Sequence, residues 1–318
     1  MSNLNYGGQA VMEGVMMRGE RNWAVCVRHP DGHIVTHRQS LTGALYRHPA
    51  FKWPFLRGLV MLWDSLGLGL RALMWSADVA LDEEENVHFS GPLAWTTVAG
   101  SLALGIGLFF LLPMFLVSLM DRQISSGLLS NLAEGATRLA FFIAYLWGIG
   151  HIPDIRRVFA YHGAEHKTIN AYEQGAPLTP KHVAKYSRAH TRCGTGFLLT
   201  VLIIFVLLST LMGRPPFWVR ILSRIVLIPV VAGISYEYIK LMARLYDKSA
   251  LARALAAPGL LLQRLTTREP DEEMLEVSIA SLQQVLASEG LKVENPVVVV
   301  PSSLPAQVMP SGGGASSS

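Results

Sequence analysis

Four long apolar runs constrain the fold of this chain more than any other feature. A run of about twenty apolar residues is long enough for a helix to cross the hydrocarbon core of a bilayer. Only 16% of the residues are charged, against about 25% in a typical soluble domain. We therefore expect a mainly α-helical, polytopic membrane protein with about four spanning helices, which cover residues 93–119, 139–152, 195–212 and 225–239.

The distribution of lysine and arginine indicates how these helices are oriented. Residues 153–194 contain seven of them, whereas the loops 120–138 and 213–224 contain two and three. Because basic loops stay on the cytoplasmic side, both termini and the central loop should be cytoplasmic. The basic residues are spread over loops that flank apolar runs, so nucleic acid is not an expected partner. The expected partner is the lipid bilayer, with other membrane proteins as further candidates.

The first fifty residues predict a small cytoplasmic β element. Residues 22–29 and 33–40 are β-like runs joined by Pro30-Asp31-Gly32, a favourable hairpin turn. The glycine-rich stretch 6–19 lacks the Gly-Lys-Ser/Thr ending of a phosphate-binding loop, so nucleotide binding is not expected. Four histidines in this part lack metal-ligand spacing and are interpreted as ordinary surface residues: His29, His33, His37 and His48.

Residues 53–80 predict an amphipathic helix. Its charged side chains recur every seventh residue and form one narrow polar stripe: Arg57, Asp64, Arg71 and Asp78. Such a helix can lie in the membrane interface or dip into the bilayer with its charges facing protein, and we favour the interfacial anchor. The chain then divides into a cytoplasmic β element (1–50), this helix with the acidic break at 82–85 (51–92), a membrane domain (93–268), a cytoplasmic amphipathic helix (269–301) and a disordered tail (302–318).

The stretch that carries recognisable chemistry is His162-Gly163-Ala164-Glu165-His166. Two histidines four residues apart lie on one face of a helix, about one turn from each other. This is the inverted zincin pattern, in which both imidazoles bind zinc and the glutamate activates a water molecule. The alternative is a polar cytoplasmic helix with solvated histidines.

Three further side chains could complete a metal site. His190 and Cys193 are zinc-type ligands three residues apart, in the His-rich loop 153–194. They meet the first pair if a helix over 154–173 and a second helix from 180 to 190 fold back as a cytoplasmic helical hairpin. Glu237 follows His166 by about seventy residues, a separation typical of the distal carboxylate in inverted zincins. Otherwise Glu237 anchors a helix end, Cys193 is a small packed residue, and His190 is a solvated loop histidine.

Four motifs in the same order resemble the YqhQ family of bacterial multispanning membrane proteins: GGQAVMEGVMMRG (7–19), YHGAEHKTINAYE (161–173), HTRCGTGF (190–197) and GISYEYIK (233–240). The similarity extends over most of residues 6–290. That family has no known function and is often labelled as predicted metal-dependent enzymes. The resemblance implies a multi-pass protein of the bacterial cytoplasmic (inner) membrane with metal chemistry around His162, Glu165 and His166. It implies no substrate.

Two classes of function remain open. In the first, the protein is a zinc-dependent hydrolase: His162, His166 and one of His190 or Glu237 hold the metal, and Glu165 is the general base. Its substrate would be a membrane protein, a peptide or a lipid-linked molecule at the cytoplasmic interface. In the second, it is a non-catalytic membrane factor, such as a scaffold, insertion aid or transporter, with a closed structural site. The expected cofactor is zinc or another divalent transition metal.

Overall fold

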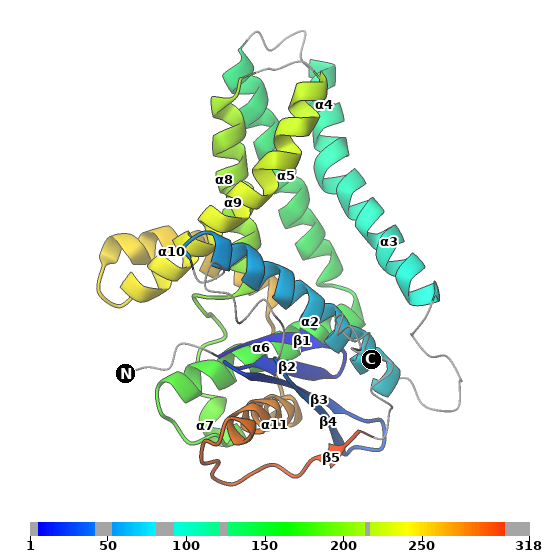
Figure 1. Ribbon diagram of the computed structural model, residues 1–318, viewed down its shortest axis with the longest axis vertical. Helices are drawn as coiled ribbons and strands as arrows, with labels where there is room; N and C mark the ends of the chain where they lie inside the picture. The colour runs from blue at the N-terminus through cyan, green and yellow to red at the C-terminus, as the bar shows by residue number, and fades with distance from the viewer. Residues whose placement is uncertain (1–5, 42–52, 81–91, 121–125, 214–216, 303–318) are drawn as a thin grey trace, which may run out of the picture.

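The computed structural model describes residues 6–41, 53–80, 92–120, 126–213 and 217–302. It consists of an α/β layer and a bundle of long helices that rises from it (Figure 1). Three sequence predictions lie outside the described residues: the acidic break at 82–85, the surface role of His48, and the disordered tail after Ser302.

A five-stranded sheet forms the centre of the α/β layer. Its strands lie side by side in chain order, the first four antiparallel and the fifth parallel to the fourth: β1 (Gly7–Val11), β2 (Gly14–Arg18), β3 (Asn22–Arg28), β4 (Ile34–Ser40) and β5 (Val300–Pro301). The predicted hairpin is confirmed, because Arg28 pairs with Ile34 across the turn. Residues 7–18, for which no strand was predicted, form a second hairpin.

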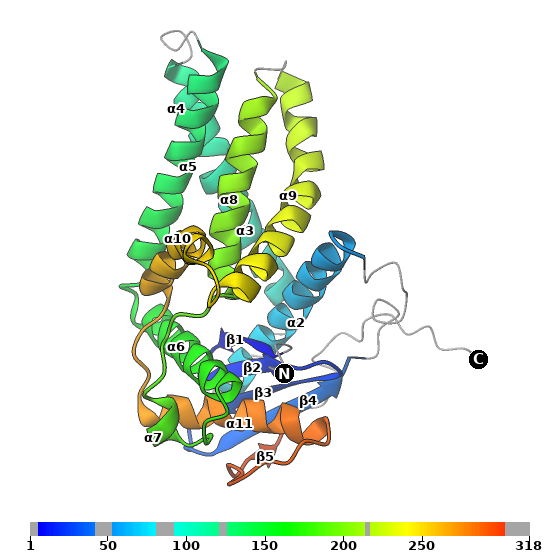
Figure 2. The same ribbon diagram turned by 90° about the vertical axis from the view of Figure 1, so that its left-hand side faces the viewer.

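Both faces of this sheet are buried against helices. One face carries α6 (Pro153–Glu173) and α11 (Glu272–Ser288), and the other carries α2 (Leu56–Ala80) (Figure 2). Successive side chains of a strand point to opposite faces. Val15 and Met17 therefore pack with α6 and α11, whereas Met16 packs with α2. A strand buried on both faces has no polar alternation, which explains why the Met-rich stretch did not look like a strand.

The bundle contains three helical segments that are long and apolar enough to cross a membrane, judged by length and composition among the described residues: Trp95–Leu119, Gly194–Leu211 and Val226–Leu245. They belong to α3 (Pro92–Ile106) with the π-helical turn η3 (Gly107–Leu111) and α4 (Leu112–Met120), to α8 (Gly194–Leu211), and to α9 (Phe217–Leu245). Helix α5 (Gly127–Ile149) stands among them (Figures 1 and 2) and contains residues 139–149 of the predicted run 139–152. Glu134 and Arg138 lower the mean hydropathy of α5, which is not among the helices apolar enough to cross a membrane. Three of the four predicted spans therefore meet this criterion.

Helix α2 joins the sheet to the bundle through its polar stripe. Arg57 forms a bidentate ion pair with Glu237 of α9. Arg18 of β2 pairs with Asp64 at 2.9 Å. The large apolar side chain of Trp63 is exposed instead. The charges of α2 that these pairs involve therefore face protein, and its exposed surface includes large apolar side chains.

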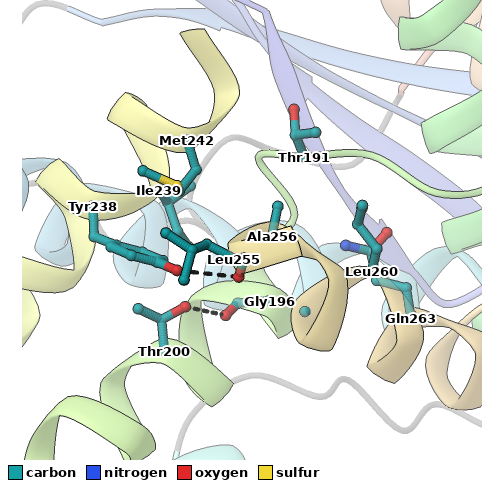
Figure 3. A pocket seen from close by; sticks show the side chains of 11 residues that line it. Thr191, Gly196, Thr200, Tyr238, Ile239, Met242, Leu255, Ala256, Leu260 and Gln263 are labelled. Atoms are coloured by element: carbon teal, nitrogen blue, oxygen red, sulfur yellow. Dashed lines mark hydrogen bonds between the residues drawn. The ribbon is translucent and has the colours of Figure 1, made fainter. Parts of the chain in front are cut away.

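Helix α10 (Ala250–Thr266) crosses the base of α8 and α9. It packs on α8 where two glycines meet: a Cβ built on Gly259 would be in ordinary van der Waals contact with Gly196, 3.4 Å from its Cα atom. A cavity of about 30 Å³ lies between these three helices, where Tyr238 donates a hydrogen bond to the carbonyl of Leu255 (Figure 3). That volume accommodates about one water molecule.

A buried ion pair holds α5 against the first apolar segment. Pro113 has no N–H, so the carbonyl of Phe109 cannot accept the hydrogen bond of a regular α-helix. The Nε atom of Arg138 donates to that carbonyl at 2.8 Å. Arg138 also pairs with Glu134 at 2.7 Å, and its guanidinium lies 5.2 Å from the ring centre of Phe110. The arginine thus compensates for the irregularity that the proline creates.

This arrangement predicts the effect of replacing the arginine. Arg138→Leu removes the cation beside a buried carboxylate and should lower the free energy of unfolding by about 3–5 kcal/mol. The double variant Glu134→Leu with Arg138→Leu should recover most of that loss, because no buried charge then remains. Thermal unfolding of the purified proteins in detergent measures both effects. If Arg138→Leu proved as stable as the wild type, the ion pair would not stabilise the packing of α5.

Candidate metal centre

Helix α6 carries both histidines, and its sequence determines where it lies. Pro153 occupies the first turn, where its missing N–H needs no partner, and the helix ends just before Gly175, which has φ +70°. Between them, Gly163 faces the chain that follows α10. A Cβ at this position would lie 2.1 Å from the carbonyl oxygen of Arg268. The glycine therefore allows α6 to approach this segment closely.

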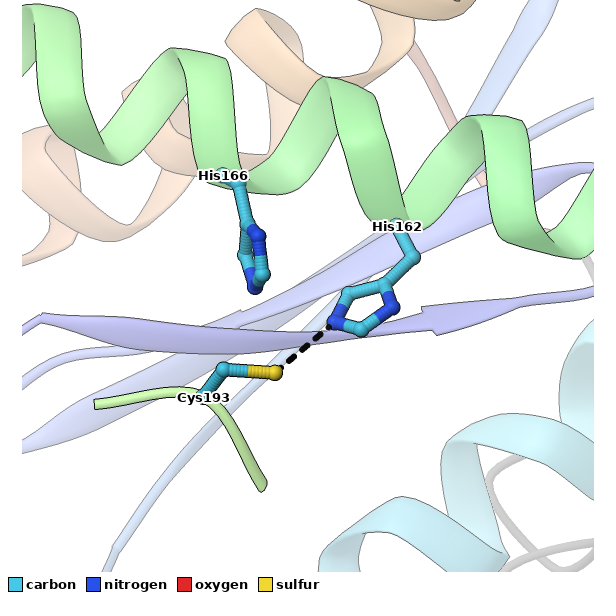
Figure 4. A group of neighbouring side chains, drawn as sticks. All are labelled: His162, His166 and Cys193. Carbon is cyan, nitrogen blue, oxygen red and sulfur yellow. Dashed lines mark hydrogen bonds between the residues drawn. The ribbon is translucent and has the colours of Figure 1, made fainter. Parts of the chain in front are cut away.

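His162, His166 and Cys193 converge on one point (Figure 4). One donor atom of each residue lies within 4.8 Å of the other two. The Nε2 atom of His162 is 3.3 Å from the Sγ atom of Cys193, and the two imidazole ring centres are 4.3 Å apart. Two imidazoles and one thiol form the kind of donor set that binds zinc.

Main-chain carbonyls orient the two imidazoles. The Nδ1 atom of His162 lies 2.9 Å from the carbonyl oxygen of Thr266, and Nδ1 of His166 bonds to the carbonyl of Arg188. A carbonyl oxygen can only accept, so each Nδ1 carries a proton and donates it. In the neutral rings, the Nε2 atoms are therefore unprotonated and free to bind a metal. Ligating histidines usually have such a partner on the other ring nitrogen.

Helix α10 also fixes the loop that carries the cysteine. The side chain of Gln263 accepts a hydrogen bond from the N–H of His190 and donates one to its carbonyl, each at 2.9 Å. Cys193 is the N-cap residue of α8, and the hydroxyl of Thr195 lies 2.8 Å from its Sγ atom. The position of the Cys193 thiol is therefore fixed by the start of α8 and by the main chain at His190, which Gln263 binds.

The prediction of a second helix from 180 to 190, which would complete a helical hairpin, was wrong. Helix α7 comprises only Pro180–Val183, and the chain from there to Cys193 is irregular. Side chains of α6 bind the carbonyls of this segment: Lys167 donates to Ala184 at 2.6 Å, and Asn170 donates to Ser187 at 2.8 Å. Carbonyls used in this way are not available for a regular helix.

The electrostatics of the cluster couple the thiol to both imidazoles. Burial alone would raise the pKa of the Cys193 thiol, but the charges and hydrogen bonds of His162 and His166 outweigh it and lower this pKa well below its usual value. Burial would lower the pKa of His162, but the Cys193 thiolate raises it to about 9. The metal-free cluster thus places a thiolate beside an imidazolium, and a metal cation can replace the proton between them.

Glu165 is buried beside this cluster. Its Oε2 atom lies 3.8 Å from Nε2 of His162 and 3.9 Å from Nε2 of His166. Strand β1 covers it closely, because a Cβ on Gly8 would lie 2.9 Å from the Cγ atom of Glu165. The carboxylate can therefore reach a molecule or ion held between the imidazoles.

The other two predicted ligands have different partners. The ring of His190 lies 5.6 Å from that of His166, but its Nε2 atom faces the carboxylate of Glu173 at 3.7 Å. Glu237 accepts hydrogen bonds from Arg57 and from the N–H of Phe55, at the start of α2. Glu237 thus docks α2 on α9, and Cys193, rather than Glu237 or His190, is the third side chain that converges with the two histidines.

Two supporting residues were not predicted from the sequence. Gln263 is a buried amide on an otherwise largely apolar helix, and this contrast was the signal that could have identified it. Thr266 orients His162 through its main-chain carbonyl, which no side-chain pattern could have revealed, and its hydroxyl donates to that of Thr195 at 3.4 Å.

The close contact at Gly163 leads to a prediction. Gly163→Ala should force α6 away from the carbonyl of Arg268 and lower the free energy of unfolding by about 1–3 kcal/mol. Gly148→Ala is the matched control, because this glycine lies in α5 with no other atoms near its Cβ position. Thermal unfolding in detergent compares the two. Equal stability of both variants and the wild type would show that the contact is unimportant.

Comparisons with known proteins agree with the sequence motifs. Residues 53–288 match a family model described as "Protein of unknown function (DUF1385)". The "Uncharacterized protein YqhQ" of Bacillus subtilis (strain 168) is 36% identical over 302 residues, which cover 91% of this chain and 95% of that relative. No solved structure matches the chain. The resemblance to the YqhQ family is thereby confirmed, and the chain belongs to this family of proteins of unknown function, DUF1385.

Proposed function

We propose that this protein is a zinc-dependent hydrolase of the bacterial cytoplasmic (inner) membrane. His162, His166 and Cys193 hold the metal, and Glu165 is the general base. The substrate is a membrane protein, a peptide or a lipid-linked molecule that reaches the cytoplasmic interface. Two findings stand behind this proposal: the family membership of the chain, and its three helices that are long and apolar enough to cross a membrane.

The observation that carries the proposal is the common orientation of the two imidazoles. Each ring donates its Nδ1 proton to a main-chain carbonyl, which leaves both Nε2 atoms beside the Cys193 thiol. A cysteine–histidine catalytic pair needs one imidazole, whereas two that converge on one thiol are typical of a metal site. Nitrogen and thiolate ligands favour zinc over magnesium or calcium.

The position of Glu165 supports an enzyme. A bound zinc ion would act as a Lewis acid towards a water molecule or a substrate carbonyl. Glu165 is near enough to both Nε2 atoms to accept a proton from a water molecule held there, and to return it to the leaving group. Three protein ligands also leave one position of a tetrahedral site open for that water.

The arrangement of the bundle supports four spans with both termini in the cytoplasm. The C-terminal ends of α4 and α8 and the N-terminal ends of α5 and α9 lie at the end of the bundle opposite the sheet (Figure 1). The α/β layer, which contains the basic segment 153–194, would then lie on the cytoplasmic side. Exposed apolar side chains on α2 and α10, such as Trp63 and Leu251, would contact the membrane interface.

A second candidate function is a non-catalytic membrane factor with a structural zinc site. The burial of the cluster favours it, because His166 is 1% exposed and Cys193 is 5% exposed. In this case Glu165 would be the fourth ligand and would close the site.

The first experiment tests whether the cluster binds metal. Protein purified in detergent and passed through a desalting column should retain about one zinc ion per chain, measured by elemental mass spectrometry. The variant His162→Ala with His166→Ala should lose it. The control, His151→Ala with His182→Ala, replaces two exposed histidines and should keep it. Equal metal in both variants would place any metal site elsewhere.

A second experiment distinguishes a hydrolase from a non-catalytic factor with a structural zinc site. For a hydrolase, Glu165→Gln should keep the metal and the fold, but activity should fall by about two to four orders of magnitude. The measurement is complementation of a deletion strain, with metal content and membrane abundance determined in parallel. Full complementation at normal abundance would reject the hydrolase. Loss of the metal from Glu165→Gln would instead identify the carboxylate as the fourth ligand.

The proposed topology has its own test. Reporter domains fused after Met120 or after Gly213 should be external, and one fused after Gly175 should be cytoplasmic, because basic segments stay inside. An external reporter at Gly175 would refute both the topology and a cytoplasmic site.

A further inference from the structure

We propose that the hairpin between β3 and β4 is a second metal site, formed by His29, Asp31 and His33, which binds an exchangeable divalent transition metal. Among the described residues, two groups bring three metal-ligand side chains within 4.8 Å of one another: the buried cluster and this one. The two sites are independent, so this proposal does not rest on the proposed hydrolase.

Main-chain contacts hold the two histidines opposite each other. The N–H of His29 donates to the carbonyl of His33 at 2.9 Å, and the N–H of Gly32 donates back to the carbonyl of His29 at 2.8 Å. The turn closes through Gly32, whose φ of +91° suits glycine. Arg28 also donates to the carbonyl of Gly32 at 2.8 Å. The ends of the hairpin are therefore fixed before any metal binds.

The side chains already lie close to the geometry of a site. The ring centres of His29 and His33 are 4.7 Å apart, and the rings are nearly parallel, at 23°. The Oδ2 atom of Asp31 lies 3.2 Å from Nδ1 of His29. A rotation of the two rings would direct one nitrogen of each towards a common ion. Two imidazoles and a carboxylate suit zinc, copper or nickel.

Access distinguishes this site from the buried centre. The side chain of Asp31 is 74% exposed and that of His29 is 21% exposed, so an ion can enter from solvent. The donor set contains no thiolate, and none of the hydrogen bonds described for these rings reaches a main-chain carbonyl as in the buried cluster. We therefore infer weaker binding that exchanges with free metal.

The site lies where the hairpin meets α11. Arg28, next to His29, donates to the carboxylate of Glu276 at 2.7 Å and to the carbonyl of Glu273 at 3.1 Å. Glu276 offsets the positive charge of Arg28, which would otherwise oppose a cation. The sequence interpretation of these histidines as surface residues without ligand spacing missed this group, because the turn brings residues 29 and 33 together.

Cobalt titration of the full chain in detergent, after a chelator has removed the zinc expected in the buried cluster, tests the proposal. Cobalt bound to a thiolate absorbs strongly in the near ultraviolet, so the buried cluster and the hairpin give different signals. The wild type should bind a second equivalent without thiolate absorption. His29→Ala with His33→Ala should lose it, and Asp31→Asn should weaken it by about tenfold. The control, His151→Ala with His182→Ala, should behave as the wild type.

Two outcomes would overturn the proposal. One is a wild-type protein that binds no cobalt apart from the thiolate-containing equivalent. The other is a second equivalent that persists, with unchanged affinity, in His29→Ala with His33→Ala. If the buried cluster proves to bind no metal, the hairpin should still bind its one equivalent, so failure of the two sites can be told apart.

Discussion

The hydrogen bonds from two imidazoles to the main chain join the parts of this molecule at its candidate centre. His162 is bonded to the carbonyl of Thr266 at the end of α10, and His166 to that of Arg188 before α8. Helix α6 is thereby attached both to the chain that enters the bundle and to the chain that leaves it. A buried imidazole without a partner would be costly, so these bonds stabilise the fold whether or not a metal is present.

The sequence was sufficient to identify the two histidines of the candidate centre, but not its third donor or the residues that orient the rings. The spacing of His162 and His166 indicates a shared helical face, whereas Cys193 was one of three further candidates, with His190 and Glu237. Thr266 lies 104 residues from His162, and every residue has a carbonyl, so nothing in the sequence marks this one. The prediction for Glu237 rested on separation along the chain, which does not reveal that Arg57 is its partner.

The fold shows the same division between local patterns and tertiary context. Long apolar runs and a Pro-Asp-Gly turn are local signals, and both led to the correct elements. The β1–β2 hairpin lacks such a signal because its strands are buried on two faces. The stripe of α2 was visible, but the sequence could not show that Arg57 and Asp64 would meet charged partners from α9 and β2.

The α/β layer is assembled from segments that are far apart in the chain. Strands β1 to β4 come first, α6 follows the first two long helical segments of the bundle, and α11 comes after the last. The hydroxyl of Ser281 on α11 donates to the carbonyl of Ala24 on β3, across 257 positions of the sequence. A layer with such a high contact order closes slowly, and the apolar face of its sheet that packs on α6 and α11 stays partly uncovered until α11 has been synthesised. During biosynthesis, the nascent sheet must therefore be protected from aggregation while the bundle is still being made.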